Sequence, residues 1–219
     1  RMDKIKYNNS GYKTTIVKDI VKKYKIENEP LLIMIANYLM DTVGNITSIR
    51  NIANRLSSNK LVTNDKTVGL YISYLCKSFL FYPIERFDVR GGKYLATDKK
   101  YYLSDLSFRF ANLGTKDVDY GFLYENLVAL ELLRREYEIY VGVLYDKEID
   151  FVAIKEGKRI YIQVADDISN ENTLQREVKP LLSIRDAYPK MIIARTKHPE
   201  ANIQGIRVID IAEWLINVE

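Results

Sequence analysis

Three polar residues in the second half of the sequence, Glu125, Asp150 and Gln163, are of types that can bind metal ions. Glu125 lies in an apolar segment of helical periodicity, where burying a carboxylate costs on the order of several kcal/mol unless it is paired or bound to a cation. Asp150 lies in the strand-like sequence EIDFVAI, where Asp is disfavoured. Gln163 lies in the next strand-like sequence, RIYIQVAD, and a hairpin would place it beside Asp150. The three oxygen-bearing side chains are therefore candidate ligands of a hard cation such as Mg²⁺.

A carboxylate on a helix, an Asp on a strand and a third oxygen ligand on the next strand form the arrangement of PD-(D/E)XK nucleases. In such a site Mg²⁺ activates a water molecule and stabilises charge at a phosphate. A Lys two residues after the third ligand normally helps to polarise that water, but here the residue is Ala165. Arg176 or Lys179, in the following helical segment, could supply the cation from another position. We therefore expect a degenerate catalytic site, and the alternative is a buried polar network that specifies the fold.

Basic residues gather in the first half of the chain. Residues 1–100 hold 18 Lys and Arg against 9 Asp and Glu, a net charge of +9, whereas residues 101–219 carry a net charge of −5. This asymmetry indicates two modules with different roles. The basic half is a candidate nucleic-acid surface, and the alternative is a Lys-rich solvated face.

The elements of the basic half favour a winged helix. Apolar residues recur at helical spacing in four segments, 14–26, 31–43, 48–58 and 66–79, and a strand, a Gly turn and a second strand follow within 79–97. Three short helices followed by a hairpin are typical of the winged-helix variant of the helix-turn-helix. We assign residues 1–27 to a linker with an amphipathic helix and residues 28–100 to the winged-helix domain.

In a winged helix the third helix enters a DNA groove. Its outward residues should include Lys66, Tyr71, Tyr74 and Lys77, and the tip of the wing should carry Arg90 and Lys93. These residues are our candidate contacts to double-stranded DNA. Winged helices also serve as protein-interaction modules, which is the alternative.

The second half has an alternating pattern of helices and strands. We predict a helix at 121–137, three strands within 138–166, a helix at 172–188, two strands within 190–211 and a short final helix. The strand–helix–strand step implies a right-handed crossover between parallel strands. The expected fold class is therefore α/β (α+β), with a restriction-endonuclease-like mixed sheet over residues 101–219.

The composition and motifs of the sequence exclude several kinds of site and a membrane span. The single Cys76 cannot form an internal disulfide or a Cys-based zinc site, and the single His198 excludes any site that needs two His. The sequence has no GxxxxGK[ST] loop, so we do not expect ATP binding through a P-loop. No apolar run is long enough to span a membrane, and we expect a cytoplasmic protein without membrane contact. Because the sequence begins with Arg1, we expect it to be part of a longer protein.

Eight segments of the sequence together resemble the C-terminal portion of a widespread prokaryotic group of AAA-superfamily ATPases. The resemblance covers nearly all of residues 12–217. The segments that carry it are TTIVKDIVKKYKI, TVGLYISYLCKSFLFYPIERFDVRGGKYL, KKYYLSDLSFR, YENLVALELLRR, EIDFVA, YIQVA, REVKPLLSIRDAYPKMII and GIRVIDIAEWL.

This resemblance implies a winged helix followed by a PD-(D/E)XK-like domain of unknown function, which accompanies an N-terminal P-loop ATPase module. Glu125, Asp150 and Gln163 match the family's "EN", "EIDF" and "QV" positions. The ATPase module itself is then a partner of the chain. Since fold does not settle function, two hypotheses stand: a DNA-binding region with a degenerate nuclease-type site, and a protein-interaction or regulatory module.

Overall fold

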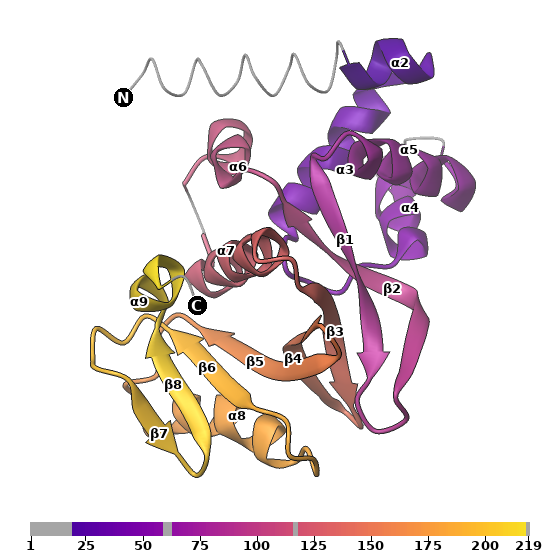
Figure 1. Ribbon diagram of the computed structural model, residues 1–219. Helices are drawn as coiled ribbons and strands as arrows, with labels where there is room; N and C mark the ends of the chain where they lie inside the picture. Colours follow the sequence, from indigo (N-terminus) through magenta and orange to yellow (C-terminus); the bar gives the residue numbers. More distant parts are fainter. Residues whose placement is uncertain (1–18, 59–62, 116–117, 218–219) are drawn as a thin grey trace. The chain divides into compact units, whose positions relative to one another are not determined.

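A computed structural model describes residues 19–58, 63–115 and 118–217 (Figure 1). The chain divides into two compact units, and each is considered by itself. The helical unit comprises the described residues up to Pro83 together with those of 98–118, and the α/β unit comprises residues 84–97 and the described residues from Asp119 onward. Residues 14–18 of the predicted first helix lie outside the described residues. The tip of the predicted wing thus groups with the α/β unit, and residues 101–115 group with the helical unit.

Four helices begin the helical unit: α2 (Lys22–Tyr24), α3 (Glu29–Asp41), α4 (Ile49–Ser58) and α5 (Asp65–Lys77). Asn28 caps α3 by accepting a hydrogen bond from Leu31 N at 3.1 Å. Asn64 caps α5 by accepting from Thr67 N at 2.9 Å. Helices α3 and α5 therefore begin where a short polar side chain satisfies a backbone N–H that has no partner within the helix.

The rest of the helical unit completes the element order of a winged helix. Parts of two long strands, β1 (Phe81–Asp88) and β2 (Lys93–Leu103), follow α5, and α6 (Leu106–Leu113) closes the unit. Thr47, between α3 and α4, forms an antiparallel bridge with Lys99 of β2. This bridge gives the unit the additional short strand segment that joins the helices of a winged helix to its hairpin.

The α/β unit carries the remaining elements. They are α7 (Tyr120–Arg134), β3 (Glu138–Leu144), β4 (Lys147–Lys155), β5 (Lys158–Ala165), α8 (Glu171–Leu182), β6 (Lys190–Ala194), β7 (Ala201–Ile203), β8 (Ile206–Asp210) and α9 (Ile211–Ile216). Within the described residues the sheet has eight strands in the order β2-β1-β3-β4-β5-β6-β8-β7. The pairs β3–β4, β4–β5 and β7–β8 are antiparallel, whereas β1–β3, β5–β6 and β6–β8 are parallel. The predicted mixed α/β fold is confirmed.

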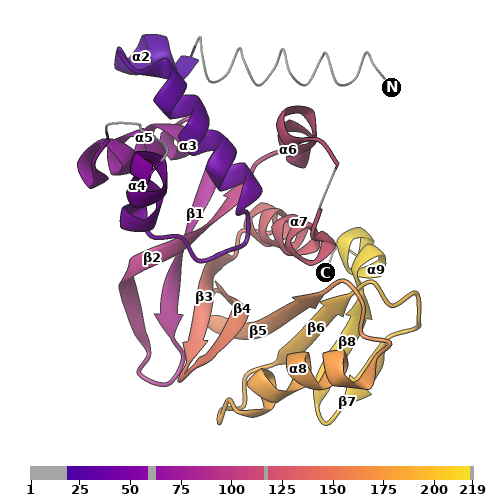
Figure 2. The same cartoon turned by 180° about the vertical axis from the view of Figure 1, so that it is seen from behind.

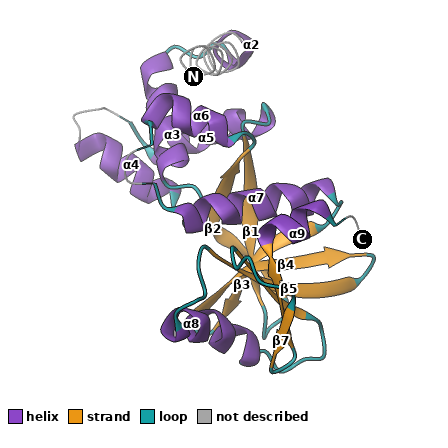
Figure 3. Ribbon diagram, turned by 90° about the vertical axis from the view of Figure 1, so that its left-hand side faces the viewer, coloured by secondary structure: helices purple, strands orange, loops and turns teal. Residues whose placement is uncertain are grey.

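Helices cover both faces of this sheet. Helices α7 and α9 lie on one face and α8 lies on the other (Figures 2 and 3). Between α8 and the sheet is a buried apolar cluster that includes Ile149, Tyr161, Ala165, Val178, Leu181 and Ile192. Helix α8 ends at Leu182, earlier than predicted, and the chain then turns toward β6. No helix in the described ranges has both the length and the apolar character needed to cross a membrane.

Gly142 of β3 allows β4 to approach closely. A Cβ atom at this position would lie 2.8 Å from Ile149 Cβ and 2.9 Å from Val152 Cγ2. Both neighbours are buried strand residues, so neither can move aside at low cost. The close approach coincides with a register shift between β3 and β4 at residues 140–142.

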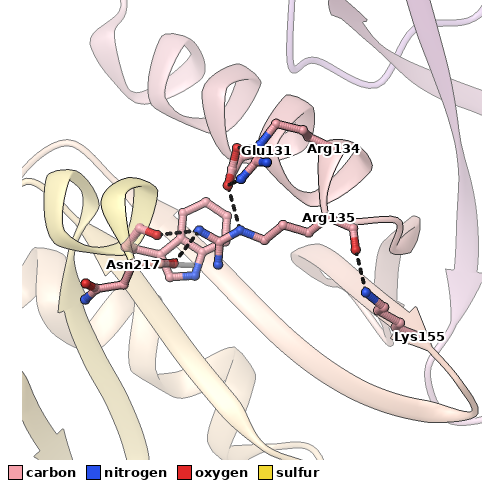
Figure 4. A network of polar contacts seen from close by, with 6 residues as sticks. Glu131, Arg134, Arg135, Lys155 and Asn217 are labelled. Atoms are coloured by element: carbon pink, nitrogen blue, oxygen red, sulfur yellow. Dashed lines mark hydrogen bonds and ion pairs between the residues drawn. The ribbon is translucent and has the colours of Figure 1, made fainter. Parts of the chain in front are cut away.

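The end of α7 is joined to α9 by a network around Arg135 (Figure 4). The Arg135 guanidinium lies 4.4 Å from the centre of the Trp214 ring and donates to the carbonyl oxygens of Trp214 and Asn217 at 2.6 and 2.9 Å. Its Nε donates to Glu131 at 2.6 Å, and Arg134 donates twice to the same carboxylate. The ion pair between Glu131 and Arg135 is therefore part of a tertiary contact, with the Glu131 side chain only 11 % exposed.

We predict that Gly142→Ala destabilises the protein by about 1–3 kcal/mol, because the added methyl group overpacks the β3–β4 contact. The matched control is Gly69→Ala in α5, where the nearest atom to the new methyl group is the half-exposed Ile49 Cδ1 at 3.3 Å. That control should leave stability unchanged or raise it by up to about 1 kcal/mol, since Ala favours a helix. Urea unfolding of both variants measures the difference, and equal effects would contradict the close approach.

A second prediction concerns pH. Hydrogen bonds from Arg134, and then those from Arg135, lower the pKa of Glu131 to about 2, while burial opposes the shift. The ionised Glu131 therefore stabilises the fold fully above pH 4.5, its ordinary pKa, and this stabilisation is lost as the pH falls toward 2. Glu131→Gln should lower the unfolding free energy at neutral pH by about 1.5–3 kcal/mol and flatten its dependence between these pH values.

The control for that experiment is Glu156→Gln, which changes an exposed carboxylate in the β4–β5 turn. Its unfolding free energy should keep the pH dependence of the original chain. If Glu131→Gln retained the same acid sensitivity as this control, the proposed role of Glu131 would be wrong.

Candidate functional site

Asp150 and Gln163 meet where the ladder between β4 and β5 ends. Regular pairing runs from Lys155↔Lys158 to Phe151↔Ile162. Beyond this point side chains take over the hydrogen bonding: Asp150 N donates to Gln163 Oε1 at 2.7 Å, and Val164 N donates to Asp150 Oδ2 at 2.8 Å. The structure therefore brings these two predicted site residues together, each bound to the backbone of the opposite strand.

A β-bulge in β4 produces this arrangement. Tyr140 pairs with Val152, and Gly142 pairs with Ile149. Two residues of β4 therefore lie between these pairs, whereas only one residue of β3 does. The extra residue falls at Asp150 and Phe151 and locally disrupts the ladder. The polar side chains of Asp150 and Gln163 then satisfy backbone groups that a regular ladder would have paired.

The network continues to Glu177 of α8, which the sequence analysis missed. Gln163 Nε2 donates to Glu177 Oε2 at 3.2 Å, and the Glu177 residue is 6 % exposed. The position of Glu177 in the helix could have identified it as buried. It lies three residues after Leu174 and directly before Val178, which are both on the buried side. A charged residue within an apolar stripe indicates a buried partner.

Arg176 lies at the outer end of this network. Its Nε donates to Glu177 Oε1 at 3.0 Å, whereas its side chain is 76 % exposed. The predicted displaced cation is thus connected to Gln163 through Glu177. Lys179, the alternative cation, is exposed one turn further along α8. The positive charge of Arg176 partly offsets the negative charge of Glu177.

Glu125, the third predicted ligand, lies on another element, helix α7. It is 5 % exposed on α7, beside the fully buried Asn126. Helix α7 covers the sheet face opposite to α8 (Figure 3), whereas Gln163 extends to Glu177 on the α8 side. The helix that carries Glu125 and the helix to which Gln163 is hydrogen-bonded therefore lie on opposite faces of the sheet.

The donor set does not fit a three-ligand Mg²⁺ site as it is folded. In the part of the chain that the structure describes, no three His, Cys, Asp or Glu side chains lie close enough together to hold a metal ion. A Mg²⁺ site would then depend on Gln163, whose Oε1 already accepts a short hydrogen bond from Asp150 N. Coordination would have to share or replace that hydrogen bond, so we derive no chemistry through a metal.

The predicted DNA-contacting residues of α5 divide into two groups. Lys66 and Lys77 are exposed, and their eleven-residue separation places them on the same side of the helix. Tyr71 was predicted to face outward, but it is only 8 % exposed. It lies in the buried stripe with Val68, Ile72 and Leu75, at helical spacings of three and four. The assignment of Tyr71 as an outward contact is therefore wrong.

Tyr74 packs against a neighbouring helix. Its ring stacks on that of Tyr24 with centroids 3.9 Å apart. Arg90 and Lys93 are exposed at the turn between β1 and β2, as predicted, and they belong to the α/β unit. The Arg90 guanidinium lies 5.4 Å from the centre of the Tyr145 ring, in the turn between β3 and β4.

Comparison with known proteins adds two relatives and a family. An uncharacterized protein of Haemophilus influenzae is 36 % identical over 205 residues, which are 94 % of this chain and 50 % of the relative. An uncharacterized protein of Methanocaldococcus jannaschii is 28 % identical over 166 residues, which are 74 % of this chain and 36 % of the relative. The chain thus spans half or less of the length of these relatives. No solved structure matches it.

A family model described as a domain of unknown function (DUF8612) matches residues 1–119. The match ends directly before Tyr120, where α7 begins. It therefore covers the helical unit and the hairpin, which are more than half of the sequence. On this evidence the chain belongs to the DUF8612 family.

Proposed function

We propose that this chain binds double-stranded DNA through its helical unit, and that its α/β unit is a nuclease-like core without hydrolytic activity. The observation that carries the proposal is the exposed side of α5, with Lys66 near its first turn and Lys77 at its end. This helix is the third of a winged-helix arrangement, the element that such proteins place in a DNA groove.

The spacing of the two lysines suits a duplex. Eleven residues of α-helix separate Lys66 and Lys77 by about 16 Å along the axis. The major groove is about 12 Å wide, so side chains at the two ends of α5 can reach phosphates on both sides of the groove. Between them, Ser73 and the 47 % exposed Leu70 leave the middle of this helix side uncharged. Such phosphate contacts position a helix and carry no sequence preference themselves.

Two features of the α/β unit support a core without hydrolytic activity. One side-chain oxygen each of Asp150 and Gln163 already accepts a hydrogen bond from a backbone N–H group within the fold. The position of the expected catalytic Lys holds Ala165, which is 5 % exposed within the apolar cluster under α8. The polar network then acts mainly to fix the bulge in β4.

We also propose that the chain is the C-terminal region of a longer ATPase-type protein. The resemblance over residues 12–217 supports this, as does the length of the relatives, of which the chain spans 50 % and 36 %. The remaining length of such a protein would supply the ATPase module, and DNA binding would then serve to recruit it.

A protein-interaction module is the second candidate, because the same unit exposes apolar side chains. Ile46, Ile49 and Leu70 are 40 %, 37 % and 47 % exposed. Ile49 lies against Gly69, next to Leu70, so two of the three share one part of the surface. A protein partner would cover these side chains, whereas a duplex would engage the lysines.

Duplex binding should weaken steeply with salt, because each phosphate contact releases counterions. We predict that Lys66→Ala with Lys77→Ala reduces the slope of log affinity against log salt by about 1.8, or about 0.9 for each contact. Fluorescence anisotropy with a short duplex at several salt concentrations measures the slope.

The matched control is Lys158→Ala with Lys197→Ala, which removes two exposed lysines of the α/β unit. This control should keep the slope of the original chain. Loss of duplex binding in both double variants to the same extent would indicate a nonspecific charge effect. No binding to duplex at low salt would favour the protein-interaction candidate.

For the α/β unit, we predict that Asp150→Ala lowers the unfolding free energy by about 1–3 kcal/mol, because it leaves Val164 N without its acceptor. Asp150→Asn keeps an acceptor oxygen and should retain most of the stability. Neither variant should alter the affinity for duplex, since the network lies away from α5 in the sequence and in a different unit. Chemical denaturation and the same anisotropy assay measure both properties.

If the chain cut a duplex when Mg²⁺ was added, and Asp150→Asn abolished the cleavage while the protein remained folded, the site would be catalytic. Such a result would overturn the inactive core but leave the DNA-binding proposal standing.

A further inference from the structure

We propose that a cleft in the α/β unit binds single-stranded nucleic acid, with phosphates held by Arg90 and Arg185 and a base stacked on Tyr145. The cleft has a volume of about 330 Å³. It lies between the β1–β2 turn, the β3–β4 turn and the segment after α8. Its lining residues are Val89, Arg90, Leu144, Tyr145, Ser183, Ile184, Arg185 and Asp186.

The charges of the cleft suit a phosphate-bearing ligand. Arg90 and Arg185 are exposed and come from different segments, so they approach the cleft from separate sides. Arg guanidinium groups bind phosphate oxygens through two parallel hydrogen bonds. Ser183 adds a hydroxyl group, and its Oγ accepts from Lys147 Nζ at 2.9 Å, which brings a third positive charge to the same cleft wall.

One acidic residue, Asp186, also lines the cleft, but its carboxylate is held by other groups. It accepts from Tyr161 Oη at 2.6 Å and from Tyr188 N at 3.1 Å, and Lys190 Nζ lies 3.4 Å away. These contacts offset its negative charge and turn it toward the interior of the unit. Among the residues that line the cleft, the two arginines outnumber this one carboxylate.

Tyr145 supplies a stacking surface. Its side chain is among the most exposed large hydrophobic ones, with 68 % of its residue surface accessible. Its backbone φ of 58° lies in the left-handed region, which is unusual for a bulky residue and sets the direction in which the ring projects. The Arg90 guanidinium lies beside the ring, so that a positive charge and an aromatic surface adjoin each other. Nucleic-acid bases stack well on such surfaces.

Aromatic and basic side chains continue beyond the cleft. The Arg159 guanidinium lies 5.3 Å from the Tyr188 ring and 4.8 Å from the Phe87 ring. Phe87 and Tyr140 both contact Tyr94, with centroids 5.5 and 5.0 Å apart, and Tyr94 is 59 % exposed. Tyr188 follows Asp186 of the cleft by two residues, and its backbone N donates to that carboxylate, whereas Phe87 is 2 % exposed and belongs to the buried core.

A single strand fits this surface better than a duplex. Proteins that bind single strands combine a basic groove with aromatic rings on which successive bases stack. The bases of a duplex are stacked on one another and cannot reach Tyr145. A cleft of this volume is at the small end of ligand-binding sites, which suits one nucleotide of a strand at a time.

This proposal does not depend on duplex binding by α5, because Arg185 and Tyr145 belong to the other unit. A crossed experiment separates the two. The intact chain is titrated with a fluorescent oligothymidylate of about 10 nucleotides, and separately with a duplex, by anisotropy at two salt concentrations. The variants are Arg185→Ala, Tyr145→Ala, Tyr145→Phe, and the double variant Lys66→Ala with Lys77→Ala.

Arg185→Ala should weaken oligothymidylate binding about tenfold and lower its salt slope by about 0.7, with no change in duplex affinity. Tyr145→Ala should weaken strand binding about fivefold or more at an unchanged salt slope, and Tyr145→Phe should restore it, because stacking needs only the ring. The α5 double variant should affect the duplex and spare the strand.

Three results would overturn the proposal. The first is the absence of strand binding at low salt by the folded chain. The second is strand binding that survives both Arg185→Ala and Tyr145→Ala. The third is competition by inorganic phosphate or a mononucleotide at concentrations as low as those of the oligonucleotide, which would assign the cleft to a small phosphate ligand instead.

Discussion

The arrangement of the α/β unit depends on one interruption, the point where β4 leaves the regular ladder with β5. Gly142 lets β3 and β4 come close, and the bulge opposite it places Asp150 where a paired residue would stand. Because buried backbone groups need partners, the side chains of Asp150 and Gln163 must complete the ladder. Gln163 in turn requires an acceptor on α8, and Glu177 supplies it. A local backbone irregularity therefore fixes the polar residues on two strands and one helix.

Local patterns in the sequence were enough to predict the element types. The apolar spacing of α3, α4, α5 and α7 and the turn at Gly91 and Gly92 all correspond to elements of the fold. The same reasoning misjudged Tyr71, because a Tyr is compatible with either side of a helix and only its spacing from Val68 and Leu75 shows that it is buried. The short edge strand β7 was not predicted, since three residues carry too little periodicity.

Contacts between elements distant in the sequence were harder to predict. In the sequence, Glu131 has Arg134 and Arg135 three and four residues later, which is the spacing of exposed ion pairs on a helix. This spacing accounts for the carboxylate without any partner from a distant element. What makes the contact tertiary is Trp214, 79 residues after Arg135, and nothing in the spacing relates the two. Likewise, Asp150 and Gln163 could be placed side by side from a hairpin, but the bulge that turns them into ladder partners depends on Gly142 on a third strand.

The surroundings of Ala165 are unsuited to the Lys that the proposed nuclease-type site lacks. A Lys at this position would project toward α8, where Ala165 shares a buried cluster with Val178 and Leu181. Its ammonium group would have to be desolvated among apolar side chains, and the nearby Glu177 already accepts from Gln163 and Arg176. The packing of α8 and the polar network would both have to change before a cation could act there. The same packing holds the segment after α8 against the sheet, and that segment carries Ser183 and Arg185 to the basic cleft. The proposed lack of hydrolytic activity in the core is thus compatible with the proposed binding of phosphate-bearing ligands at the surface.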